Sequence, residues 1–157
     1  MFTGCYERRI DHRGYVTLPA GFRAALFHGE DKSPVVLSHF IIRRQLCLDV
    51  NPVARWQDIA SRYASAPLRD KNMVAFRTYV LSGAIERAVN RRGQILIPRP
   101  LREDAGLRGE LVISGGVSLF RIFSREAWDK LRTTAKHGLI GHAELQAQME
   151  NGAVLLS

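Results

Sequence analysis

The chain has 157 residues, a formal net charge of +8 at pH 7 and an apolar share of 46%. This apolar share is that of a globular protein and excludes an intrinsically disordered chain. No apolar run approaches the ~18 residues of a membrane span, and two cysteines are too few for a disulfide framework or a zinc cluster. We therefore expect a soluble, cytoplasmic protein. The basic excess points to a polyanion, most often nucleic acid, although an arginine-rich codon usage would give the same excess.

An internal repeat is the clearest signal in the sequence. When the chain is shifted by 79 positions, seven of the twenty residues from Gly4 to Arg23 are identical to their counterparts from Gly83 to Arg102. Most of the remaining pairs are conservative, and no gap is needed. About one identity would be expected by chance. The chain is therefore a tandem duplication.

Each repeat unit predicts a strand, a tight turn, a second strand and a helix. An Asx residue followed three positions later by glycine is typical of a turn, because the Asx side chain accepts from nearby amides and glycine adopts positive φ. A proline then ends the second strand and precedes the helix. The expected elements are strands at 5–10, 84–89, 16–18 and 95–97, turns at 11–14 and 90–93, and helices at 20–27 and 100–105.

The downstream parts of the two halves also correspond. In each half an apolar strand and a return strand lead into a helix that carries a tryptophan, Trp56 or Trp128, which we interpret as a core anchor. Between the halves, residues 67–81 have apolar residues at helical spacing. We predict module 1 at 1–65, a linking helix packed on a barrel at 66–82, module 2 at 83–133, and a C-terminal tail with a short helix at 134–157.

Basic side chains gather around the two predicted turns. Arg9 and Arg13 flank the first loop, and Arg91 and Arg92 flank the second. Two such turns on one edge could contact the phosphates and guanine edges of double-stranded DNA. The simpler alternative is that individual arginines pair with nearby acids on a solvated face. The repetition of Arg13 and Arg92 beside a turn glycine favours a binding role for these two.

Catalysis and cofactor binding have no support in the sequence. There is no phosphate-binding glycine loop, zinc-protease motif or nucleophile elbow. His137 and His142 lack a third ligand nearby, so we expect no metal site. A lone Cys5 at the start of a strand is interpreted as a small buried hydrophobe. We expect no enzyme activity, no cofactor and no small-molecule substrate.

Several segments resemble the MraZ family, from residue 1 to about residue 133. They are Met1–Gly4, Ile10–Gly14, Leu18–Arg23, Leu81–Ala84 and Ile97–Leu107. The resemblance implies an α+β fold of tandem duplicated AbrB-like (SpoVT-AbrB) swapped-hairpin β-barrel modules with peripheral helices. It also implies a ring-like homo-oligomer that associates with the nucleoid. Such proteins bind short direct repeats upstream of the division and cell-wall gene cluster, usually as a repressor of transcription.

The family also carries an Asp-x-x-x-Arg signature in each half, and this chain departs from it. Tyr15 and Gln94 stand where the two arginines are expected, and Asn90 replaces one aspartate. Tyrosine can donate to phosphate and glutamine can pair with adenine, so we include Tyr15 and Gln94 among the candidate DNA-binding residues. The departure leaves two hypotheses open: a sequence-specific DNA-binding regulator, or a ring-forming interaction protein that has lost specific DNA readout.

Overall fold

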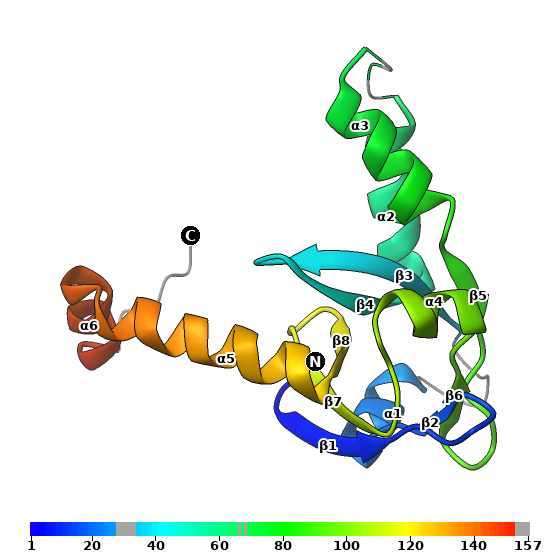
Figure 1. The fold of residues 1–157 in the computed structure, drawn as a ribbon, viewed down its shortest axis with the longest axis horizontal. Coiled ribbons are helices and arrows are strands. Elements are labelled where there is room, and N and C mark those ends of the chain that lie inside the picture. Colours follow the sequence, from blue (N-terminus) through cyan, green and yellow to red (C-terminus); the bar gives the residue numbers. More distant parts are fainter. Residues whose placement is uncertain (28–33, 66, 68, 153–157) are drawn as a thin grey trace.

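The computed structural model describes residues 1–27, 34–65, 67 and 69–152. These residues form an α+β fold with antiparallel strand pairing, as predicted (Figure 1). The first half contributes β1 (Cys5–Arg9), β2 (Tyr15–Thr17), α1 (Ala20–Leu26), β3 (Val35–Ile42), β4 (Gln45–Pro52) and α2 (Val53–Ala64). The corresponding elements of the second half are β5 (Ile85–Arg87), β6 (Gln94–Leu96), α4 (Arg99–Asp104), β7 (Glu110–Gly115), β8 (Phe120–Ser124) and α5 (Arg125–Ile140).

The strands of the two halves interleave in one sheet. The order is β1-β7-β8-β4-β3-β5, so that β1 pairs with β7 of the second half and β5 pairs with β3 of the first. The strands β2 and β6 form a separate two-stranded ribbon. The counterparts in the two halves are β1 and β5, β3 and β7, and β4 and β8. When each strand is replaced by its counterpart, the order reads the same from the opposite edge of the sheet. This is the pattern of a pseudo-twofold axis between β4 and β8. Neither half therefore builds its own sheet.

The expected β-barrel is not confirmed. The hydrogen-bonded ladders of the described strands are an open six-stranded sheet and a separate ribbon, and they do not close into a ring. The edge strands β1 and β5 continue through tight turns into β2 and β6, which pair with each other instead of closing the sheet. The module boundaries at residues 65, 82 and 133 stay predictions.

The main core lies between one face of the sheet and the β2–β6 ribbon with α1 and α4. It contains alternate residues of the sheet strands, such as Leu37, Leu48 and Ile122, together with Val16 and Ile95 of the ribbon. The alternation follows from strand geometry, which sends successive side chains to opposite faces. Burial of these apolar side chains is the main favourable term holding the ribbon to the sheet.

Helices α2 and α5 cover the opposite face of the sheet. Under α5 a small apolar cluster contains Phe123, Ala127 and Cys47, with Trp128 packed against it at a ring distance of 5.3 Å from Phe123. Trp128 and Trp56 are half-buried, so they pack at the edge of the core. Cys5 is exposed, which corrects the expectation that it is buried, because the edge strand β1 turns this side chain away from both cores.

Two helical arms project from the body (Figure 1). One is α5 continuing into α6 (Ala143–Glu150), and the other is α2 with α3 (Lys71–Phe76) and the π-helical turn η1 (Arg77–Leu81). The predicted linking helix thus becomes α3 and η1. Its Phe76 packs on Tyr63 of α2 at a ring distance of 4.6 Å, and α3 itself stands away from the sheet.

Residues 66 and 68 of the predicted linker and the tail beyond 152 lie outside the described residues. None of the helices in the described ranges is long and apolar enough to cross a membrane.

Candidate nucleic-acid interface

The first candidate loop is the turn between β1 and β2. The Asp11 side chain organises it, because its Oδ1 accepts from the backbone amides of Arg13, Gly14 and Tyr15 at 2.9 Å each. These hydrogen bonds, first of all the one from Tyr15, lower the pKa of Asp11. Gly14 has φ +100°, which a residue with a Cβ rarely adopts. The turn is therefore stabilised by residues within it, the Asp11 side chain and Gly14.

In the second candidate loop, the turn between β5 and β6, the neutral amide of Asn90 takes the place of the Asp11 carboxylate. Asn90 Oδ1 accepts from the amides of Arg92 (3.0 Å) and Gln94 (2.8 Å), and Asn90 Nδ2 donates to Gln94 Oε1 at 3.2 Å. Gly93 has φ +75°. The Gln94 side chain is consequently held against its own turn, and the second loop carries one negative charge fewer than the first.

Crosswise hydrogen bonds join the two loops. The amide of Leu18 donates to the carbonyl of Gly93, and the amide of Ile97 donates to the carbonyl of Gly14, both at 2.9 Å. Between them, Val16 pairs with Ile95 in the β2–β6 ribbon. The two turns are thereby fixed side by side as one unit.

Two further arginines support these turns, again crosswise. Arg23 of α1 lies over Gly93, where an added Cβ would be 2.7 Å from its Cζ, and Arg102 of α4 lies over Gly14, where the same distance would be 3.0 Å. The Nε atoms of both arginines are buried without a hydrogen-bond partner among the described residues. The identity of Arg23 and Arg102 in the repeat is a sequence signal for this role. That each arginine supports the turn of the other half could not be predicted from it.

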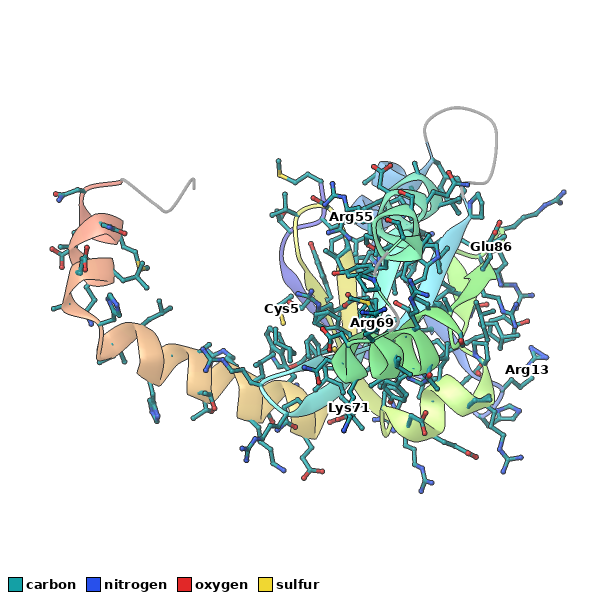
Figure 2. All side chains as sticks on the ribbon, turned by 90° about the horizontal axis from the view of Figure 1, so that it is seen from above. Cys5, Arg13, Arg55, Arg69, Lys71 and Glu86 are labelled. Carbon is teal, nitrogen blue, oxygen red and sulfur yellow. The ribbon has the colours of Figure 1, made fainter. Side chains whose placement is uncertain are left out.

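The candidate DNA-binding residues occupy different environments. Arg13 is exposed and points away from the body, with its Cζ 5.4 Å from the centre of the Tyr15 ring (Figure 2). Arg91 and Arg92 are exposed on the second turn, while Tyr15 and Gln94 are half-buried. All five lie on or next to the two turns.

Arg9 is oriented differently. It extends from β1 toward its strand neighbour Glu110, with Nη1 and Oε1 3.6 Å apart and both side chains well exposed. Such an exposed pair contributes little to stability. Arg9 and Glu110 line a shallow hollow that is separate from the turns and that also includes Arg125. The side chain of Arg9 is therefore already engaged by an acid, Glu110.

A second basic hollow, which sequence reasoning missed, lies beside the first turn. It has a volume of about 290 Å³ and is lined by His12, Arg99, Arg102, Glu103, Leu107 and Arg108. Arg99 Nε donates to Glu103 at 2.7 Å, which raises the pKa of Arg99. The aligned repeat places Ala20 where Arg99 stands. Helix α4 therefore begins with a basic side chain where α1 begins with an apolar one, a difference visible in the aligned repeats.

The described residues hold no cluster of metal-ligating side chains. No group of three or more His, Cys, Asp or Glu side chains there could hold a metal ion. Cys5 is exposed, and its pKa is raised, first by partial burial and then by Glu7. A raised pKa disfavours the nucleophilic thiolate. What the described site offers chemically is a set of exposed guanidinium groups on a rigid frame.

Known proteins resemble this chain over most of its length. Residues 80–149 match the family described as "MraZ protein, putative antitoxin-like". A protein named "Transcriptional regulator MraZ" from Thermoanaerobacter sp. (strain X514) is 34% identical over 132 residues, which are 83% of this chain and 85% of the relative. One of the same name from Halothermothrix orenii is 33% identical over 153 residues, 96% of this chain and 98% of the relative. A third, from Roseiflexus castenholzii, is 35% identical over 131 residues, with shares of 83% and 86%.

Proposed function

The chain belongs to the MraZ family, and from this premise we propose that it is a sequence-specific DNA-binding regulator of transcription. It binds double-stranded DNA at short direct repeats and represses the division and cell-wall gene cluster. The contacts come from the two turns, through Arg13 and Tyr15 on one and Arg91, Arg92 and Gln94 on the other. Arg9 adds a phosphate contact at their flank.

The observation that carries this proposal is the crosswise joining of two arginine-bearing turns. Arg13 and Arg92 are exposed, and the turns that hold them are fixed to each other by the Leu18–Gly93 and Ile97–Gly14 hydrogen bonds. A pair of guanidinium groups carried on a rigid ribbon suits phosphates and guanine edges, because the backbone of the ribbon loses little conformational freedom on binding.

Assembly completes the proposed function. The candidate interface of one subunit consists of two short turns, so we propose a ring-like homo-oligomer in which neighbouring subunits bind successive repeats and combine weak contacts through multivalency. The interleaved strands support a swapped-hairpin arrangement of the 1–65 and 83–133 modules. A regulator of this kind acts in the cytoplasm, in association with the nucleoid.

The test is a binding titration with DNA from upstream of the protein's own gene. Fluorescence anisotropy at several salt concentrations would compare the parent with Arg13→Ala and Arg92→Ala. Each variant should bind about 5- to 150-fold more weakly, because a bidentate arginine contact contributes roughly 1–3 kcal/mol of discrimination. The slope of log K against log [salt] should also become shallower, since fewer counterions are released.

Arg132→Ala is the matched control, because Arg132 is an exposed arginine on the α5 arm. This variant should bind like the parent, and all three should keep the parent's size in analytical ultracentrifugation. Parental affinity in both Arg13→Ala and Arg92→Ala would remove these residues from the interface.

The alternative function is a ring-forming interaction protein without specific DNA readout. The observation in its favour is that Tyr15 and Gln94 carry no guanidinium where the family signature has arginine, and that the Gln94 amide is hydrogen-bonded to Asn90 of its own turn. Equal affinity for upstream DNA and for a shuffled sequence of the same composition, at about 150 mM salt where weak phosphate contacts fade, would favour this alternative.

A further inference from the structure

Helix α2 and the β2–β6 ribbon lie on opposite sides of the sheet (Figure 1). The sheet face under α2 contains a groove of about 320 Å³. Its floor includes Ser38 and Asn51, each only 1% exposed, and its walls include aromatic side chains such as Trp56 and Tyr63. This volume is at the lower end of the range for small-molecule sites. The proposed DNA-binding turns do not use this groove.

The floor holds polar groups without protein partners. Asn51 Oδ1 accepts from Arg55 Nη1, but Asn51 Nδ2 and the Ser38 hydroxyl have no hydrogen-bond partner among the described residues. Both residues line the groove, so a ligand with hydrogen-bonding capacity would find unused polar partners on its floor.

The second half of the chain provides an internal comparison. Asn51 and Arg55 stand five and one positions before Trp56, and the residues at the same places before Trp128 are Phe123 and Ala127. Phe123 and Ala127 form a closed apolar cluster between α5 and the sheet. The groove under α2 therefore exists because polar residues replace the side chains that fill the related space under α5.

The charge of the groove selects an anion. Three arginines line it, Arg55, Arg62 and Arg121, against the single acid Asp49. Arg121 is paired with Asp49 at 2.7 Å, whereas Arg62 is exposed and has no partner among the described residues. Asp49 also interacts with Arg55, so one carboxylate is shared and positive charge remains in excess next to flat apolar walls. This combination suits an oxyanion attached to an aromatic or apolar body.

We propose that this groove binds a small organic anion, a carboxylate or phosphate carried on a flat apolar body. The oxyanion lies between Arg55 and Arg62, the apolar body lies against Trp56 and Tyr63, and the Asn51 amide donates to the ligand. This site is distinct from the DNA-binding turns, so it can exist whether or not the proposed transcriptional role is correct.

The test uses 2-naphthoate as the probe and the uncharged 2-naphthamide as its matched compound, with affinities measured by isothermal titration calorimetry on the full-length protein. The carboxylate should bind at least about tenfold more tightly than the amide, because charge-assisted hydrogen bonds are the stronger ones. Asn51→Phe with Arg55→Ala, which copies the second half, should abolish binding. Arg62→Ala, on the exposed surface of α2, should weaken binding severalfold even if the double variant fails to fold.

The binding site of 2-naphthoate is located by ¹⁹F NMR of protein labelled with 5-fluorotryptophan. Its two signals come from Trp56 and Trp128. The Trp56 signal should shift on addition of 2-naphthoate while the Trp128 signal stays in place, and Arg132→Ala should behave as the parent. Equal binding of acid and amide, or a shift of Trp128 alone, would overturn the proposal. A Trp56 shift that appears only after the assembly is dissociated would also overturn it, because a second copy would then fill the groove.

Discussion

Asp49 and Arg121 occupy equivalent places in the two halves and form an ion pair with each other. Each stands seven positions before its half's tryptophan, they face one another in the β4–β8 register, and Arg121 Nε lies 2.7 Å from Asp49 Oδ1. The pseudo-twofold axis therefore passes between them. If the two halves were identical, the same residue type would stand at both positions and could not form an ion pair with itself. The pairing of an acid with a base there therefore depends on the two halves having diverged in sequence.

Removing Arg121 should destabilise the protein. Asp49 is 7% exposed, and burial raises its pKa while Arg121 opposes that shift. Arg121→Ala leaves the carboxylate buried without its main counter-charge, which costs about 3–5 kcal/mol of unfolding free energy. Urea denaturation at pH 8 would measure the loss, with Arg132→Ala expected within about 0.5 kcal/mol of the parent.

The same pair predicts how that loss depends on pH. Without Arg121 the pKa of Asp49 rises further, so a fall in pH protonates Asp49 in the folded state before it does so in the unfolded state. The difference in unfolding free energy between the parent and Arg121→Ala should therefore shrink from pH 8 to pH 5. A difference that stays constant over this range would mean that lost packing on Phe40, 4.6 Å from the guanidinium, causes the effect.

Gly93→Ala should destabilise the second turn. Its φ of +75° disfavours a side chain, and the added Cβ would lie 2.7 Å from Arg23 Cζ. We expect a loss of roughly 1–3 kcal/mol in urea denaturation. Gly21→Ala is the matched control, because Gly21 lies in α1 and its Cβ would meet nothing within 4 Å. This control should raise stability by about 0.5–1 kcal/mol, and equal effects of the two changes would contradict the described turn.

His39 should make stability fall at acidic pH. It is 6% exposed, stacks on Tyr79 at a ring distance of 4.3 Å, and lies 3.4 Å from Asp104. Burial lowers the pKa of His39, and Asp104 only partly opposes this. Because the unfolded chain binds the proton at its ordinary pKa near ~6.5, stability is full above that value. It declines as the pH falls from there through the lowered folded-state pKa.

His39→Phe keeps a ring against Tyr79 and removes the titrating group. Its urea denaturation at pH 8 and at pH 5 should show a smaller decline on acidification than the parent shows. An identical decline would place the acid sensitivity in other groups.

The two cysteines should react at very different rates. Cys5 is exposed, while Cys47 is 1% exposed and burial raises its pKa to about 12. Only a thiolate reacts with a disulfide reagent such as DTNB. At pH 8 the native protein should release one equivalent of chromophore, and the second should appear only in denaturant. Two equivalents from the native protein would contradict the packing under α5.

Much of this fold follows from the sequence. The repeat, the Asx-Gly turns and the prolines predicted the strands and helices to within a few residues, because those signals are local. The interleaving of β1 with β7 could not be predicted from them, since it depends on contacts between distant segments. At the candidate site, repetition singled out Arg13 and Arg92. The hollow beside His12 was missed because Arg99 has no basic counterpart in the first repeat.

The interleaved sheet has a consequence for synthesis. The strand β1 leaves the ribosome long before β7, the partner that satisfies its backbone groups, and β3 waits in the same way for β5. The nascent chain therefore carries unpaired strand edges until most of it has been made, and such edges invite pairing with other chains. Folding should be largely post-translational and slow for a protein of this size, and crowded translation of the same message should favour exchange of strands between neighbouring nascent copies.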